Sequence, residues 1–194
     1  MKQKLLLTFL MIFTIKSFAQ DSKFSIELNY PIPIDENLIG RSYNGIINAG
    51  LKYNFANLDF MNLGVSLNSG IFKNTKEDRV QPFDATIYIF SPRINSEFKI
   101  KSLEKLHPSV GLGYSIVNFR ADVDRFNSET NSDVSSSQSE NGVNLNFGLA
   151  YDITNNLFLQ IQYDFIKIGV DNDVPDFKYN TNINLVKIGL GYRL

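Results

Sequence analysis

Cysteine and tryptophan are absent from this chain of 194 residues, and histidine occurs once, at His107. A chain without cysteine forms no disulfide bond, binds no metal through thiolates and carries no lipid on an N-terminal cysteine. A single histidine gives little support to a histidine-ligated metal or to a nucleophile activated by a histidine base. We therefore predict no catalytic residue, no cofactor and no metal site.

Long hydrophobic runs are also missing, since no segment after residue 19 has the roughly 18 consecutive apolar residues of a membrane helix. The formal net charge is −1, and it becomes −4 without residues 1–19, which hold three lysines and no acid. Clusters of lysine and arginine that would bind a phosphate backbone are lacking. This composition argues against nucleic acid as a partner.

The N-terminal residues have the pattern of an export signal. Lys2 and Lys4 precede an apolar stretch over residues 5–15, and Ser17 and Ala19 form a small-residue cleavage pattern. The stretch is too short to cross a bilayer as a helix, so an uncleaved membrane anchor is the less favoured alternative. We predict a signal peptide over residues 1–19 and a single domain over residues 20–194.

Eight segments of the remaining chain alternate apolar and polar residues, which is the pattern of β-strands with two different faces. They cover residues 23–30, 43–55, 60–72, 86–100, 109–119, 143–153, 157–168 and 182–194. Long connections at residues 31–42, 73–84, 121–142 and 169–181 alternate with short ones at 56–59, 101–107 and 154–156. This rhythm predicts an all-β fold, an eight-stranded antiparallel up-and-down transmembrane β-barrel with its long loops outside the cell.

The composition of the two faces favours a membrane barrel over a soluble barrel with an apolar interior. Glycine, serine and asparagine dominate the polar face and suit a narrow lumen. The apolar face carries an aromatic ring near each end, as expected for residues at the two membrane interfaces. The first ring contains Phe24, Tyr53, Phe98, Tyr151 and Tyr192, and the ring near the long loops contains Tyr30, Tyr43, Tyr88, Tyr163 and Phe165.

Two places depart from the alternation. Pro92 interrupts the fourth segment, and a proline inside a strand usually marks a bulge. The fifth segment has apolar residues on both faces at Ile116, Val117 and Phe119. Together with Ile87 and Ile89, inward-facing Val117 and Phe119 line a small hydrophobic pocket or form a plug of ordinary packing, and the plug is the favoured interpretation.

Charged residues of both signs occur on the polar face. In a narrow lumen they should form ion pairs, because an unpaired charge is costly to desolvate. An ion path is the less favoured alternative, since side chains fill the interior of an eight-stranded barrel. The predicted network contains Glu27, Lys52, Arg93, Glu97, Asp164, Lys187 and Arg193, with Glu27 as a partner for Lys187 and Arg193.

The C-terminal segment ends in the spacing polar-x-Gly-x-x-aromatic-x-apolar, formed by Lys187, Gly189, Tyr192 and Leu194. This spacing resembles the assembly signal of bacterial outer-membrane barrels, although Leu194 replaces the usual phenylalanine. The chain resembles small outer-membrane barrels of the OmpA, OmpX and OmpW kind. It is similar in particular to single-domain barrels of Bacteroidetes-type bacteria, whose signal peptides often end as Phe18-Ala19-Gln20 does.

The resemblance implies a monomer in the cell outer membrane, inserted by the barrel assembly machinery and in contact with outer-membrane lipids and lipopolysaccharide. The four long loops hold thirteen acidic and six basic residues, and the acids at 171–176 lack the glycine and distal glutamate of an EF-hand.

We expect a non-enzymatic structural or surface-interaction role. A narrow channel for small or hydrophobic solutes, as in OmpW-like barrels, is the alternative. A lipid-modifying enzyme of the outer leaflet comes third, because His107 falls in an exposed turn on the periplasmic side.

Overall fold

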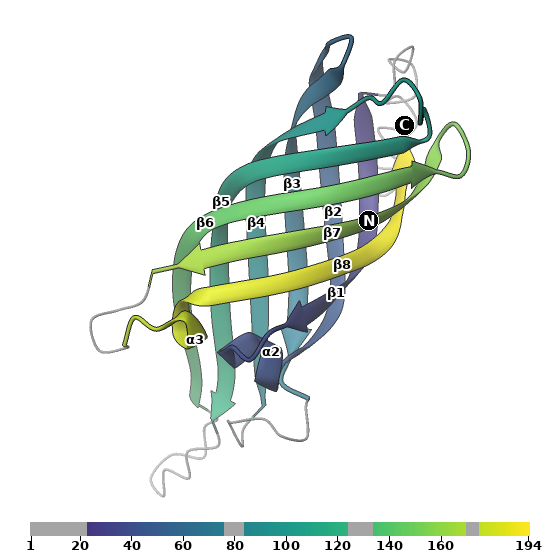
Figure 1. The fold of residues 1–194 in the computed structure, drawn as a ribbon. Coiled ribbons are helices and arrows are strands. Elements are labelled where there is room, and N and C mark those ends of the chain that lie inside the picture. Colours follow the sequence, from purple (N-terminus) through teal and green to yellow (C-terminus); the bar gives the residue numbers. More distant parts are fainter. Residues whose placement is uncertain (1–22, 76–83, 124–133, 170–174) are drawn as a thin grey trace, which may run out of the picture.

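The computed structural model describes residues 23–75, 84–123, 134–169 and 175–194, which form one closed barrel (Figure 1). Each strand pairs antiparallel with the next, and β8 returns to pair with β1. The predicted eight-stranded fold is therefore confirmed. The predicted signal peptide lies outside the described residues, and within them no helix is long and apolar enough to cross a membrane.

The elements follow the chain in simple order, with two short helical turns in the longer connections. They are β1 (Phe24–Ile34), α2 (Leu38–Ser42), β2 (Asn44–Asn57), β3 (Met61–Lys73), β4 (Ala85–Phe98), β5 (Leu106–Val123), β6 (Val134–Asp152), β7 (Leu157–Ile168), α3 (Lys178–Thr181) and β8 (Asn182–Arg193). We call the end with the longer connections the loop end, and the end with the short connections and the C-terminus the turn end.

Strands β1, β5 and β6 are longer than the sequence predicts, chiefly at the loop end. β1 continues to Ile34, and the predicted loop over residues 121–142 is largely a ribbon in which residues 117–123 pair with 134–140. Only residues 124–133 of that loop lie outside the described part. At the turn end, β5 begins at Leu106, so His107 belongs to a strand and not to an exposed turn.

Pro92 causes no bulge, so that prediction is wrong. β4 pairs with β3 without a register shift, and its pairing with β5 has the same register on either side of Pro92. Only two pairs of the β4–β5 ladder are missing there, and Pro92 faces outward. The irregular strand is β2, whose register with β3 shifts between Gly45 and Ile47 and again between Asn54 and Ala56.

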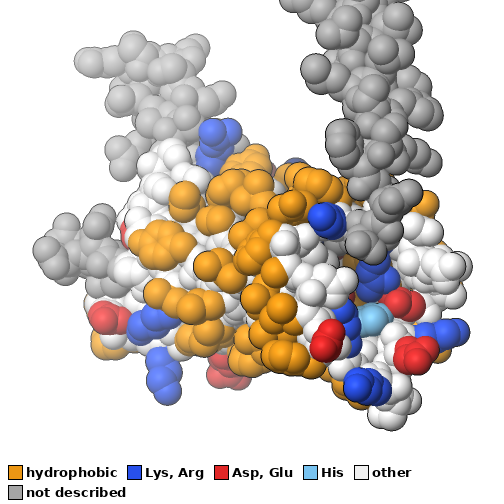
Figure 2. Space-filling view, turned by 90° about the horizontal axis from the view of Figure 1, so that it is seen from above, with side chains coloured by type: hydrophobic (Ala, Val, Ile, Leu, Met, Phe, Trp, Pro, Cys, Tyr) orange, Lys and Arg blue, Asp and Glu red, His pale blue; other side chains and the backbone are white. Residues whose placement is uncertain are grey.

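The outer wall is apolar over a height that suits a membrane. On β4 the exposed apolar residues run from Phe98 near the turn end to Tyr88 near the loop end. With a rise of about 3.3 Å per residue and a tilt of about 40°, this stretch spans about 25 Å, the height of the apolar band of membrane barrels. In Figure 2, hydrophobic side chains form a broad area on the visible face, and charged side chains gather mostly at its margins.

The barrel closes along the seam between β1 and β8. Gly189 of β8 pairs with Asn29 of β1. A Cβ atom on Gly189 would lie 2.1 Å from the carbonyl oxygen of Leu28, which is far inside van der Waals contact. The two backbones approach each other so closely that only glycine fits at this position.

We predict that Gly189→Ala greatly reduces the folded yield, because the added methyl group meets backbone and not a flexible side chain. The yield is measured from heat-modifiable migration on gels after refolding from urea. Gly169→Ala is the matched control, since its Cβ would have its nearest described neighbour at 3.9 Å. Equal folded yields for the two variants would contradict the steric argument.

Candidate functional site

The interior of the barrel contains two layers of different chemistry. In the half toward the turn end, the inward side chains are mainly polar or charged. In the half toward the loop end, they are mainly aliphatic and aromatic. We call the first the ionic layer and the second the apolar plug.

Asp164 of β7 is the centre of the ionic layer. Its Oδ2 atom lies 2.7 Å from an Arg93 guanidinium nitrogen and 2.8 Å from Lys187 Nζ. Asn146 donates a hydrogen bond of 2.6 Å to the other carboxylate oxygen. All three charged side chains are almost fully buried, so one carboxylate compensates two cations out of contact with bulk water.

A second ion pair joins Lys52 of β2 to Glu97 of β4, also inside the lumen. Glu27 of β1 accepts a hydrogen bond of 3.1 Å from Gln162. Glu27 forms no ion pair with Lys187 or with Arg193, so the partner predicted for these two cations is wrong. The six other predicted network residues do form ion pairs, although the acid that meets Arg193 was not in the predicted set.

Asp152 of β6 is the acid that meets Arg193, at 2.6 Å, near the turn end. Its other carboxylate oxygen lies 2.8 Å from His107 Nε2, and the Arg193 guanidinium stacks over the Phe158 ring at 4.6 Å. The alternation in the sequence puts Asp152 on the polar face of its strand, so Asp152 could have been included among the lumen charges from its position alone. The prediction that His107 lies exposed in a turn is wrong. Strand β5 begins at Leu106, so His107 lies within the strand, and its ring contacts Asp152.

The apolar plug fills the loop-end half of the lumen. Ile89 of β4 lies directly opposite Val117 of β5, and Phe72 of β3 lies opposite Ile87. The buried members are Ile39, Tyr43, Phe72, Ala85, Ile87, Ile89, Val117, Ile166, Ile168, Ile183 and Leu185. Phe119 and Ala121 pack against them. The favoured interpretation, a plug of ordinary packing, agrees with this arrangement.

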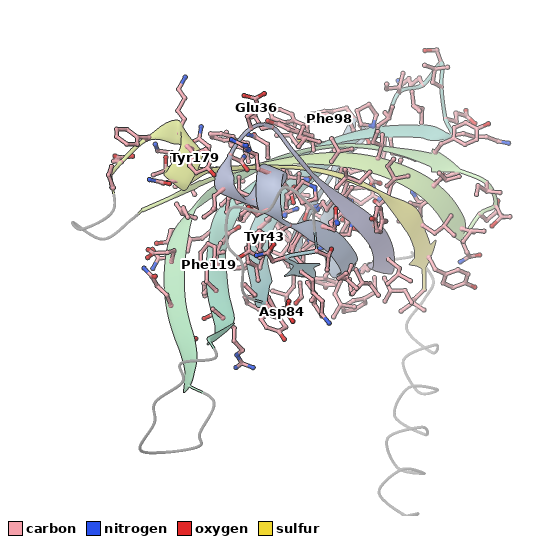
Figure 3. The ribbon with its side chains drawn as sticks, turned by 90° about the horizontal axis from the view of Figure 1, so that it is seen from below. Glu36, Tyr43, Asp84, Phe98, Phe119 and Tyr179 are labelled. Carbon is pink, nitrogen blue, oxygen red and sulfur yellow. The ribbon has the colours of Figure 1, made fainter. Side chains whose placement is uncertain are left out.

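Tyr43 belongs to the plug and not to the outer aromatic ring, so its predicted position is wrong. Asn37 caps α2 by accepting a hydrogen bond of 2.6 Å from the Gly40 backbone nitrogen, which turns the chain back toward the barrel. Tyr43 follows this turn and is only 2% exposed. Figure 3 looks onto the loop end and shows Tyr43 near the middle of the view.

The plug also explains the apolar run on the fifth segment. Strand β5 keeps its alternation throughout, with Val117 inward and Ile116 outward. The inward chemistry changes from Ser115 to Val117, and at similar levels from Ser91 to Ile89 and from Asp164 to Ile166. Toward the loop end from this level, apolar residues therefore occupy both faces of the strands. In the sequence, this change from the ionic layer to the apolar plug has the appearance of a break in the alternation of β5.

Between the ion pairs lies a small polar cavity. Its volume is about 30 Å³, and its lining includes Glu27, Lys52, Arg93 and Glu97. This is the space open to the centres of water-sized spheres, and on that measure a single water molecule needs about 10–15 Å³. The cavity is therefore large enough for a small number of water molecules that hydrate the ion pairs.

Sequence comparison identifies the architecture independently. The family profile described as an outer membrane protein beta-barrel domain matches residues 5–193. The chain belongs to this family. No curated protein sequence matches it significantly.

Solved structures of outer-membrane proteins share the fold of this family member. Neisserial surface protein A is 17% identical over 89% of this chain and 97% of its own, with a TM-score of 0.62. Ail of Yersinia pestis, in complex with the heparin analogue sucrose octasulfate, is 15% identical over 88% and 96%, with a TM-score of 0.57. OprG of Pseudomonas aeruginosa is 12% identical over 87% and 94%, with a TM-score of 0.54.

The four residues of the predicted assembly signal are divided between the outward and the inward face of β8. Tyr192 faces outward and is 43% exposed, while Lys187 is buried against Asp164. The Leu194 backbone nitrogen donates a hydrogen bond of 2.9 Å to the Phe24 carbonyl, which brings the C-terminus to the start of β1. Their role in assembly stays a prediction.

We predict that Asp164→Asn destabilises the folded barrel by about 3–5 kcal/mol, because it leaves two cations buried without a carboxylate. The free energy is measured by urea unfolding in phospholipid vesicles. Asp176→Asn is the control, since Asp176 forms an exposed ion pair of 3.5 Å with Lys167 and its loss should cost at most about 1 kcal/mol. Similar losses in both variants would refute the structural role of the Asp164 ion pairs.

Proposed function

We propose that this outer-membrane barrel is a closed, non-enzymatic scaffold that presents a binding surface at the loop end, outside the cell. The observation that supports this proposal is the filled interior. The ionic layer and the apolar plug follow one another along the lumen, and the described polar cavity holds about 30 Å³. A lumen that side chains fill along its described length favours a role at the surface over the passage of solutes.

The ribbon formed by β5 and β6 is the most prominent described element of this surface. Pairing of β6 with β7 begins only at Gly142, so among the described residues the segment 134–140 of β6 pairs with β5 alone. Ser137, Gln138 and Ser139 are exposed there. An open strand edge of this kind accepts an extended polypeptide segment as an additional strand. A protein partner is therefore the preferred ligand class for this surface.

The similarity to Ail supports a binding role at the surface, but the loop charges indicate a different class of ligand. Ail was solved with a heparin analogue, which is a polyanion. The four long loops of the present chain hold thirteen acidic and six basic residues, so they disfavour a polyanion as ligand.

Insertion as a monomer by the barrel assembly machinery belongs to this proposal. The closer affinity to Bacteroidetes-type barrels rests on Phe18-Ala19-Gln20 alone.

Bilayer conductance tests the closed scaffold against the alternative of a narrow channel. We predict no steady single-channel current for the refolded protein in a planar bilayer. Double replacement of Lys52 and Glu97 by alanine removes a complete ion pair from the lumen and serves as the comparison for enlarged interior space. Steady conductance of the unmodified protein that changes on Arg93→Ala or Glu97→Gln would overturn the closed scaffold.

Lipid A analysis tests the third candidate, an outer-leaflet enzyme. Within the described residues, the His107–Asp152 pair lies at the turn end, away from the outer leaflet of the proposed orientation. We predict identical lipid A mass spectra from cells with and without the gene. A mass difference that disappears on His107→Ala would establish an enzymatic role.

A further inference from the structure

Residues 137–140 of β6 form an open strand edge, which we call the ribbon edge. Where the β6–β7 ladder ends, the Gly169 backbone nitrogen donates a hydrogen bond of 2.9 Å to the Asn141 carbonyl. Alternate residues of an antiparallel strand direct both backbone polar groups to the same side. Ser139 and Ser137 therefore direct their N–H and C=O groups to the ribbon edge. Among the described residues, no strand lies beyond these groups.

The inner face of the ribbon carries a negative charge beside this edge. Gln138 lies opposite Phe119, and Glu140 lies opposite Val117. Val117 belongs to the apolar plug and Phe119 packs against it, so Gln138 and Glu140 share the inner face. Gln138 Nε2 donates a hydrogen bond of 2.7 Å to Glu140 Oε1, which holds the carboxylate toward position 138.

The outer face carries the opposite charge. Arg120 of β5 lies opposite Ser137 and is exposed, and its guanidinium carbon lies 5.9 Å from the centroid of the Tyr88 ring. This cation–π contact holds the guanidinium on the outer face of the wall. A strand added at the ribbon edge has its outer face about 10 Å from Arg120, two strand spacings away. A basic residue is therefore better placed on the inner face, toward Glu140.

The pairing geometry determines which residue of an added strand meets Glu140. Residues opposite Ser137 and Ser139 exchange hydrogen bonds with them. The residue between these two lies opposite Gln138, at a non-hydrogen-bonded position where side chains are closest. Its side chain is on the inner face, and Glu140 is its diagonal neighbour at about 7–8 Å, within reach of a long basic side chain.

We propose that the ribbon edge binds an extended segment of a partner protein that has a basic residue opposite Gln138 and uncharged residues on either side of it. The thirteen acidic and six basic residues of the four long loops attract such a segment before contact. A shift of one residue would turn the basic side chain to the outer face, so the charge also sets the register. The inference rests on the proposed function, since it places the loop end outside the cell, and it adds the charge and register of the partner.

The test uses two synthetic peptides, Thr-Val-Thr-Lys-Thr-Val-Thr and the same peptide with glutamate in place of lysine. Each carries a fluorescent label and is titrated with the refolded protein in lipid nanodiscs at low ionic strength, and fluorescence anisotropy measures the binding. We expect the lysine peptide to bind about 3- to 10-fold more tightly than the glutamate peptide. Glu140→Lys should reverse this preference.

Two controls separate the charge of Glu140 from the net charge and from non-specific adsorption. Glu36→Lys makes the same charge change on the connection between β1 and α2, away from the ribbon, and should leave the preference unchanged (Figure 3). N-methylation of the two threonines next to the lysine removes the donors to the Ser137 and Ser139 carbonyls and should abolish binding. N-methylation of the lysine should leave binding intact. Heat-modifiable migration confirms that each variant is folded.

Three results would overturn the inference. They are equal affinity of the two peptides, a lysine preference that survives Glu140→Lys, and absence of binding by either peptide. None of them bears on the closed scaffold, which the conductance measurement decides. A conducting barrel that keeps the charge-dependent preference would refute the closed scaffold and leave the ribbon edge established as a binding site.

Discussion

The narrowness of an eight-stranded barrel is the constraint on which the rest of this structure depends. Closure of β8 on β1 leaves an interior wide enough for side chains and little else. Each inward residue must therefore fill space or meet a partner of complementary charge. The ionic layer around Asp164 meets the second requirement, and the apolar plug around Val117 meets the first.

The parts of the fold that the sequence predicted are those where the membrane imposes a pattern. A strand with lipid on one side and a polar lumen on the other must alternate, so the strand count and the exposed faces were predictable. Beyond the membrane that contrast disappears. The serine-rich start of β6 carries no apolar signal, so the sequence predicts a loop where β6 pairs with β5.

The partners inside the lumen were harder to predict than the residues themselves. Inward charges follow from parity along each strand, but the tilt of the strands decides which of them meet across the barrel. Arg93 of β4 reaches Asp164 of β7, whereas Glu27, one strand away from Arg193, pairs with no cation of the described network. Tyr43 was misplaced because its position depends on the α2 turn, which enters the lumen.

The two layers of the lumen should also differ in how freely they change during evolution. An aliphatic cluster tolerates exchange among side chains of similar volume, so Ile87, Val117 and Ile183 can vary one at a time. Around Asp164, a single substitution leaves a buried charge without a partner. A change that preserves stability there requires simultaneous substitutions in two or three strands. Homologous barrels with a common ancestor should therefore retain the ionic layer as a unit and diverge first in the plug.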